Sequence, residues 1–262
     1  MKYTVLTLFP EIIDAYFASS IIAKALGRGI IEYRAVNIRD YAIDKHRTCD
    51  DAPYGGGPGM LMLAEPLGRA LEAVLSGFSG KHAENGYKPR VIYLTPSGRP
   101  FNQALARELI TEKELILICG RYEGIDQRII DSYVDDEISV GDYVLSSGEV
   151  AALILIDSTY RLVEQVITPA SLEEESFERF LLEYPQYIRP EIYGTLRVPE
   201  VLLSGHHENI RRWRLEKRVE KTLALRPDLI RLGEESFLFD DEVLKIIEQK
   251  RREMEKHGEG DR

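Results

Sequence analysis

The segment Leu115-Ile116-Leu117-Ile118-Cys119 is an unbroken apolar run, and Gly120-Arg121-Tyr122-Glu123-Gly124 follows it directly. A short apolar run that ends in glycine is typical of a strand buried on both faces of a sheet. Similar extended runs recur along the chain, at residues 3–8, 31–37, 91–95 and 134–139. Stretches with helical spacing lie between them, at residues 11–27, 64–75, 103–110 and 150–163. This alternation predicts an α/β fold, in which a largely parallel sheet carries helices on both faces.

The bulk composition excludes several classes of protein. The chain has 262 residues, of which 44% are hydrophobic and 30% charged, as in an ordinary globular protein. No apolar run is long enough to span a membrane. A net charge of -10 argues against general affinity for nucleic acid but leaves room for a local basic surface. Only two cysteines occur, Cys49 and Cys119, which favours a reducing cytoplasm over a disulfide scaffold or a zinc site.

The character of the sequence changes near residue 168. Thr168-Pro169-Ala170-Ser171 and Glu173-Glu174-Glu175 have the composition of a linker, and further prolines precede helical runs at residues 206–224 and 240–256. We therefore expect a cofactor-binding domain over residues 1–167, a linker over 168–175 and a smaller helical domain over 176–262.

Two glycine-punctuated loops, residues 120–124 and 141–148, are the strongest indication of a ligand site. Ligands of open α/β sheets bind beyond the carboxyl ends of the strands, where glycine lets the backbone approach a ligand closely. One such loop is an ordinary strand-to-helix turn, but two that flank consecutive strands can form two walls of one pocket. Because no Gly-x-Gly-x-x-Gly or P-loop signature is present, the pattern argues against a dinucleotide or a triphosphate and leaves an adenosine-type ligand.

Two further features have both a plain and a functional interpretation. Residues 54–59 form a third glycine cluster within the long loop 38–62, which is either a mobile surface loop or part of a site. Four cations at spacings of three, four and three lie on one helical face, namely Arg211, Arg214, Arg218 and Lys221. That face is either solvated and balanced by glutamates of the same helix, or a phosphate-binding strip, which the acidic character of the rest of the chain makes a stronger alternative than usual.

The motifs run in one order over nearly the whole chain. They are residues 7–11, 46–47, 50–51, 53–60, 119–126, 141–146, 156–158, 187, 189–191, 201–206 and 210–214. Together they closely resemble the bacterial tRNA (guanine-N1)-methyltransferases of the SPOUT class. The resemblance implies a sheet with a deep C-terminal trefoil knot and a homodimer with active sites at the subunit interface. It also implies S-adenosylmethionine-dependent methylation of N1 of the guanosine at position 37, 3′ of the anticodon.

Residue by residue, the resemblance implies three sets of contacts with S-adenosylmethionine. They are Tyr93, Leu94, Thr95 and Pro96; Gly120, Tyr122, Glu123 and Gly124; and Ser139, Val140, Gly141, Asp142, Tyr143, Val144 and Leu145. Residues 140–145 are expected to make the most direct contacts. The cations of the strip at Arg211, Arg214, Arg218 and Lys221 become candidates for tRNA phosphates, and the target base must leave its stack to reach the pocket. The family is reported to use magnesium, although the sequence shows no cluster of metal ligands.

The catalytic pair contains a departure from the family. Guanine N1 is a poor nucleophile while it keeps its proton, so the reaction needs a base near N1 and a positive group near O6. The resemblance implies Arg161 as the positive group, and the family's base is an aspartate directly before a Ser-Phe pair. Here that residue is Glu175, whose extra methylene moves the carboxylate by about 1.5 Å. Glu174 is an alternative base, and residues 173–175 can also be a simple acidic helix start.

Two other departures and two other functions stay open. Ser147 stands where the family usually has glycine, and Ala151 stands where proline is common. Lost catalysis at Glu175 would make the chain an RNA-binding homologue, whereas failure to bind S-adenosylmethionine would favour a nucleotide-dependent metabolic enzyme of doubly wound fold.

Overall fold

The structure is a computed structural model that describes residues 1–78, 87–168 and 174–260. Its contacts divide the chain into two compact units, Met1–Ile167 and Thr168–Arg262, and each is described here by itself. Residues 79–86, residues 169–173 of the expected linker and residues 261–262 lie outside the described residues.

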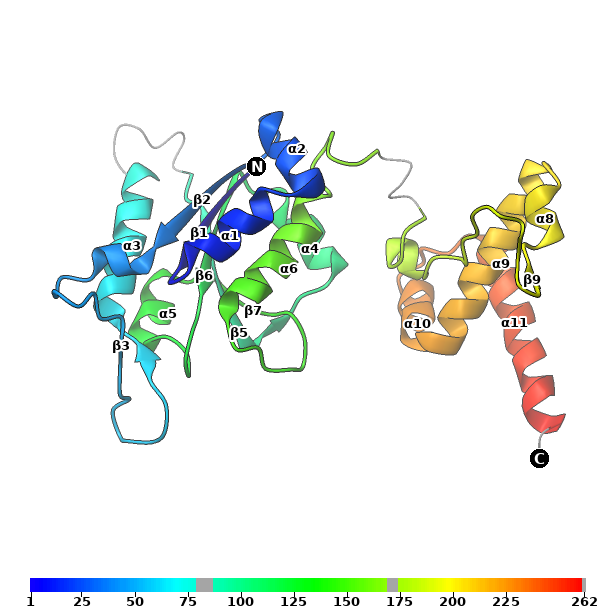
Figure 1. Cartoon of the computed structure of the whole chain (residues 1–262). Coiled ribbons are helices and arrows are strands. Elements are labelled where there is room, and N and C mark those ends of the chain that lie inside the picture. The colour runs from blue at the N-terminus through cyan, green and yellow to red at the C-terminus, as the bar shows by residue number, and fades with distance from the viewer. Residues whose placement is uncertain (79–86, 169–173, 261–262) are drawn as a thin grey trace. The chain divides into compact units, whose positions relative to one another are not determined.

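A parallel sheet of five strands forms the centre of the first unit (Figure 1). Its order is β2 (Glu32–Asn37), β1 (Lys2–Thr7), β6 (Glu114–Cys119), β5 (Arg90–Pro100) and β7 (Asp136–Ser139). Every pairing is parallel, so the predicted α/β architecture is confirmed.

Side chains of β6 alternate between two hydrophobic cores, one on each face of the sheet. Leu115, Leu117 and Cys119 belong to one core, and Ile116 and Ile118 to the other. The first core is covered by α1 (Pro10–Phe17), α2 (Ser20–Gly27), α4 (Gln103–Leu109) and α6 (Gly148–Tyr160). The second is covered by α3 (Ala64–Leu75) and α5 (Gln127–Tyr133). Burial on both faces explains why β6 is apolar throughout.

Two expectations for the first unit are wrong in detail. The single helix expected over residues 11–27 is two helices, and Ser20 at the break has φ 56°, in the left-handed region. The loop 38–62 contains the 3-10 turn η1 (Ile38–Tyr41) and an antiparallel pair formed by β3 (Asp50–Asp51) and β4 (Leu61–Met62). A further 3-10 turn, η2 (Ser76–Phe78), follows α3.

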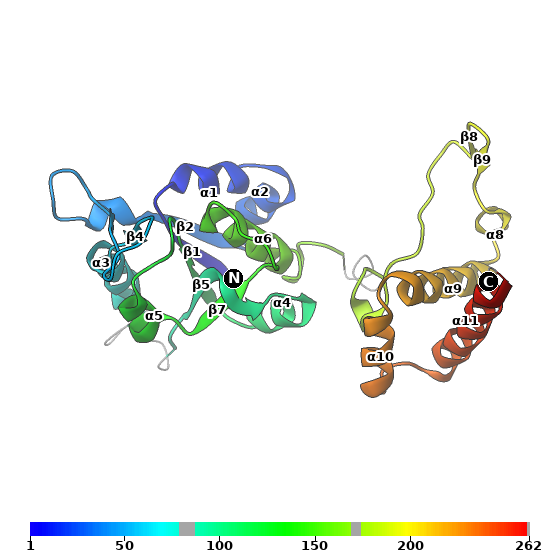
Figure 2. The ribbon, with the colours of Figure 1, turned by 90° about the horizontal axis from the view of Figure 1, so that it is seen from below.

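The second unit is mostly helical (Figure 2). Its elements are η5 (Glu178–Phe180), β8 (Ile192–Tyr193), β9 (Leu196–Arg197), α8 (Glu200–Leu203), α9 (His207–Leu225), α10 (Pro227–Glu235) and α11 (Asp241–Gly260). Leu181, Val219, Ile230, Phe239 and Ile247 form its core. Sequence analysis predicted α9 and α11 but missed α10, which begins with Pro227 at its first position, where the missing N–H costs nothing.

Candidate active site

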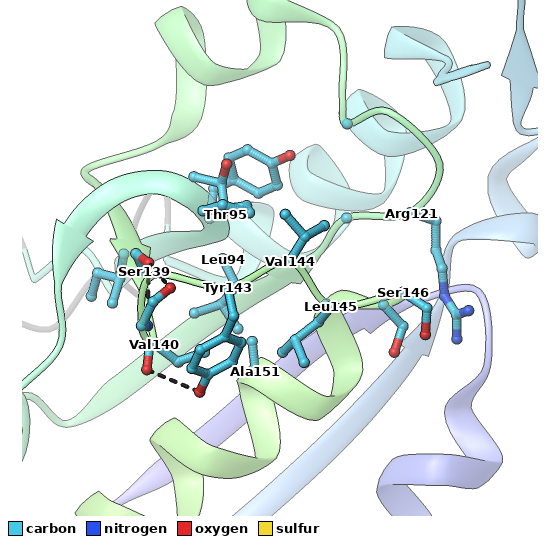
Figure 3. Close-up of a pocket in the computed structure, with 18 of the residues that line it drawn as sticks. Leu94, Thr95, Arg121, Ser139, Val140, Tyr143, Val144, Leu145, Ser146 and Ala151 are labelled. Atoms are coloured by element: carbon cyan, nitrogen blue, oxygen red, sulfur yellow. Dashed lines mark hydrogen bonds between the residues drawn. The ribbon is translucent and has the colours of Figure 1, made fainter. Parts of the chain in front are cut away.

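A cavity of about 190 Å³ lies beyond the carboxyl ends of β5, β6 and β7 (Figure 3). All of the predicted cofactor-binding residues except Asp142 line it. Asp142 is exposed on the same loop. The structure adds six lining residues that sequence analysis did not assign, namely Arg121, Ile138, Ser146, Ser147, Gly148 and Ala151. The two glycine loops therefore do form walls of one pocket.

An irregularity in β5 opens one side of the cavity. Ile138 of β7 is paired both with Leu94 and with Arg99, so the residues between them leave the ladder. Gly98 lies so close to β7 that a Cβ there would be 2.4 Å from the backbone N of Ile138. The bulge therefore requires glycine at this position, and it places Thr95 and Pro96 at the cavity.

The start of α6 is packed directly on the end of β6. Gly148 N–H donates a hydrogen bond to the carbonyl of Gly120 at 2.9 Å, and a Cβ on Gly148 would lie 2.6 Å from the Gly120 nitrogen. A Cβ on Gly120 would in turn be 2.9 Å from the ring of Tyr93. These glycines are needed because no side chain fits between the backbones. Ser147, a departure from the family, has an ordinary extended φ of -159° and fits as the residue before α6.

The loop after β7 is shaped by its own hydrogen bonds. Ser139 Oγ donates to the carbonyl of Gly141 at 3.1 Å, and the Tyr143 hydroxyl donates to the carbonyl of Val140 at 3.2 Å (Figure 3). Gly141 has φ 152° and lies against the Tyr143 ring, which a Cβ would meet at 2.4 Å. Main-chain groups beside the apolar side chains of Val144 and Leu145 can bind a flat heteroaromatic ring and its polar edge.

A buried charged cluster behind the pocket was not predicted. The Glu149 side chain is fully buried at the start of α6 and accepts a hydrogen bond from Thr7 Oγ1 at 2.5 Å. Arg121 Nε lies 3.0 Å from the second carboxylate oxygen, without the alignment of a hydrogen bond, and its guanidinium stacks 4.4 Å from the centre of the Phe9 ring. The cluster thus joins both glycine loops to the end of β1.

Backbone hydrogen bonds hold the loop with the third glycine cluster, residues 54–59, beside the same pocket. Glu123 N–H donates to the carbonyl of Met60, and Met62 N–H donates to the carbonyl of Gly124, both at 3.0 Å. The Tyr122 hydroxyl donates to Asp50 at 3.1 Å, and burial together with this carboxylate raises the pKa of Tyr122. The ends of the loop 50–62 therefore belong to the site.

The predicted catalytic pair lies on two different units. Arg161 is half-buried directly after the last residue of α6 in the first unit. Glu175 is half-buried in the second unit, and its carbonyl accepts a hydrogen bond from Glu178 N–H at 3.2 Å. Neither residue is without an interaction partner.

The predicted cationic strip is not an open surface. Arg211 is exposed but pairs with Glu208 and Glu242, at 2.8 Å each. Arg218, which was predicted to bind tRNA phosphates, is only 8% exposed and donates to backbone carbonyls. Helical spacing correctly predicted that these residues share one face of the helix. It did not show that this face packs against other residues of the same unit.

Two features are absent from the part of the chain that the structure describes. Over residues 1–78, 87–168 and 174–260, no group of three or more His, Cys, Asp or Glu side chains could hold a metal ion. In the same part of the chain, no helix is long and apolar enough to cross a membrane.

The fold and the cavity define an α/β protein with a ligand site beyond the carboxyl ends of parallel strands. A family model described as tRNA (Guanine-1)-methyltransferase TrmD matches residues 1–232. A tRNA (guanine-N(1)-)-methyltransferase of Treponema denticola is 60% identical over 249 residues, or 95% of this chain and 98% of the relative. Those of Treponema pallidum and Borreliella burgdorferi are 54% identical over 257 residues and 56% identical over 231 residues. These matches cover 98% and 87% of this chain, and 99% and 92% of the respective relatives. The chain belongs to the tRNA (guanine-N1)-methyltransferase family.

Proposed function

We propose that this protein transfers a methyl group from S-adenosylmethionine to N1 of guanosine 37 in tRNA, 3′ of the anticodon. One observation carries the proposal. The cavity built by the glycine loops lies within the part of the chain that matches the methyltransferase family, residues 1–232.

The residues around the cavity fit S-adenosylmethionine. Three glycines shape the cavity, because a Cβ on Gly120 or Gly141 would meet a tyrosine ring and a Cβ on Gly148 would meet the backbone at the end of β6. Val144 and Leu145 offer apolar contacts to an adenine ring, and main-chain groups of residues 139–145 face its polar edge. Glu123 and Thr95, at the other side of the cavity, are suited to the polar methionine end.

The chain's own residues then have defined roles in the reaction. The bound S-adenosylmethionine supplies an electrophilic methyl group. Glu175 accepts the proton from guanine N1, and Arg161 stabilises the negative charge that develops on O6. Both roles need the guanine outside its stack in the anticodon loop. Arg211 remains a candidate ligand of a tRNA phosphate. To bind it, the guanidinium exchanges one of its carboxylate partners for the phosphate.

In the proposed arrangement the protein is a homodimer with its active sites at the subunit interface, and Arg161 and Glu175 belong to different units of the chain. Exposed apolar side chains at the pocket support this arrangement, because Val144 is 85% exposed and Tyr143 is 51% exposed. We assign cofactor binding to residues 1–167, linkage to 168–175 and tRNA binding to 176–262.

A trefoil knot is supported by the path of residues 140–147. This segment passes the ends of both β5 and β6 before α6 packs back on the sheet. We place the enzyme in the cytoplasm, since its tRNA substrate is there and both cysteines are free. A magnesium ion would have to be bound with the help of the substrates, because the described residues offer no preformed cluster; no step above depends on it.

The decisive experiment is single-turnover methylation of tRNA by the Glu175→Gln variant. We expect the rate to fall by about 100-fold or more, because the amide cannot accept the N1 proton. Glu164→Gln, an exposed change near Arg161, is the matched control and should leave the rate unaltered.

Other outcomes of the same experiment identify the alternatives. An unchanged rate in Glu175→Gln removes this residue as the base, and loss of the rate in Glu174→Gln instead assigns the role to Glu174. Wild-type protein that binds S-adenosylmethionine in calorimetry but methylates no tRNA is the RNA-binding homologue. Failure to bind S-adenosylmethionine at all contradicts the proposal.

A further inference from the structure

The turn that follows Glu175 has an unusual backbone. Phe177, Arg179 and Phe180 have φ values of 74°, 48° and 59°, although none is glycine. Such conformations cost free energy and persist only where surrounding contacts enforce them. The turn is closed by Phe177 N–H, which donates to the carbonyl of Leu181 at 2.8 Å. Something outside the turn must stabilise this geometry.

One face of α9 supplies these contacts. Arg218 Nε donates to the carbonyl of Leu182, and Arg218 Nη2 donates to the carbonyl of Glu178, both at 3.3 Å. Lys221 Nζ donates to the carbonyl of Glu183 at 3.2 Å, and Thr222 Oγ1 accepts from Leu182 N–H at 2.9 Å. Residues 218, 221 and 222 are neighbours on one side of a helix, so together they clamp the turn.

The same face holds the residue before Glu175. Arg214 Nη1 lies 3.7 Å from a carboxylate oxygen of Glu174, and its guanidinium stacks 4.8 Å from the centre of the Tyr184 ring. Two of the predicted phosphate ligands, Arg214 and Arg218, therefore contact the segment that carries the proposed base.

Arg218 is the central residue of this clamp. It is 8% exposed, and burial lowers its pKa, which shows the cost of placing the charge there. A guanidinium has several donors in a fixed plane and can bond two carbonyls at once, whereas a phosphate could not reach a buried side chain without opening the turn. Two hydrogen bonds connect Arg218 to Glu175. The carbonyl of Glu178 accepts one from Arg218, and the N–H of Glu178 donates the other to the carbonyl of Glu175.

We propose that Arg218 is a positioning residue for methyl transfer, which holds the turn 177–182 and thereby places Glu175, and that it does not bind tRNA. The inference rests on the proposed function, in which Glu175 is the base. A carboxylate displaced by about 1 Å costs on the order of a hundredfold in rate, so loss of the clamp has a measurable effect.

The test compares Arg218→Met with wild type in the full-length protein. We expect the single-turnover rate to fall by roughly 10- to 100-fold, with the affinity for tRNA and its salt dependence unchanged. Hydrogen exchange of the amides in residues 177–184 should become faster. Arg218→Lys, which keeps the charge and one donor group, should recover part of the rate. Arg212→Met on an exposed position of the same helix is the matched control and should alter neither the rate nor the exchange.

A double variant separates this inference from the proposed function. If Arg218 acts through Glu175, then Arg218→Met adds no further loss to the Glu175→Gln variant. Weaker tRNA binding with a smaller salt slope and an unchanged rate would make Arg218 a tRNA ligand and overturn the inference. Full additivity of the two changes would overturn it as well. A third outcome is that Glu175→Gln keeps full activity, whereas Arg218→Met has a lower methylation rate and faster hydrogen exchange in residues 177–184. In that case Glu175 is not the base, but Arg218 still positions the turn.

Discussion

Glu149 illustrates how a single residue can organise both walls of the pocket. Its carboxylate is fully buried, yet it accepts from Thr7 and pairs with Arg121, which stacks on Phe9. An isolated buried carboxylate would be very unfavourable, so the position of Glu149 in the core requires these partners. The cluster therefore stabilises the fold and keeps the loop after β6 against the start of α6.

At the residue scale, we expect Glu149→Gln to lower the free energy of unfolding of the first unit by about 3 kcal/mol. The change leaves the half-buried Arg121 guanidinium opposite a neutral group, and removing the charge of a buried ion-pair partner is costly. Urea unfolding followed by circular dichroism measures this, because the single tryptophan, Trp213, lies in the second unit.

The control for this prediction is Glu65→Gln, which breaks the exposed pair with Arg69 on α3. It should change the stability by less than about 0.5 kcal/mol. An equally small effect of Glu149→Gln would mean that the buried cluster does not contribute to stability.

Among the secondary-structure elements, α6 and β6 are in close backbone contact beside the pocket. Gly148 allows the first turn of the helix to touch the backbone at the end of the strand, next to the proposed cofactor. The contact depends on the absence of a side chain at position 148, where a Cβ would meet the backbone of Cys119 and Gly120.

For this pair of elements, we expect Gly148→Ala to weaken binding of S-adenosylmethionine by roughly tenfold or more, since the new methyl group forces α6 away from β6. Isothermal titration calorimetry measures the affinity. Gly27→Ala at the end of α2 is the matched control, because a Cβ there meets nothing within 4 Å. Equal affinities for the two variants would disprove the importance of the contact.

At the scale of the whole molecule, the proposed dimer makes a prediction about mixed subunits. Arg161→Met and Glu175→Gln should each be inactive alone. If Arg161 of one protomer works with Glu175 of its partner, a mixed dimer has one intact site. Equal co-expression should therefore restore about a quarter of the wild-type activity, because half of the dimers are mixed and one site in each is intact.

Differently tagged chains allow the mixed dimers to be purified and assayed. If the mixed dimers stay inactive, both catalytic residues of a site come from the same chain. Sedimentation of the wild-type protein as a monomer would contradict the dimer itself.

Much of the first unit follows from local sequence patterns. The strands and the helices that cover them were predictable from apolar periodicity, as β6 and α3 show. The pocket was predictable because parallel strands end at one edge of a sheet, where the loops 120–124 and 141–148 must meet. The break at Ser20 and the helix α10 were missed, since both depend on backbone geometry and packing that apolar spacing does not encode.

The sequence alone determined the α/β class, the family and the position of the ligand pocket, because these depend on local periodicity and on residues that recur in a characteristic order. Only the tertiary structure decided the surroundings of charged side chains. In the sequence, Glu149 resembles an ordinary acidic residue in the first turn of a helix. Arg218 resembles one of four cations on a solvated helical face. Each is buried by segments distant in sequence, β1 and residues 178–182 respectively. The physical reason is that helical spacing shows which side chains share a face, whereas long-range packing decides what that face contacts.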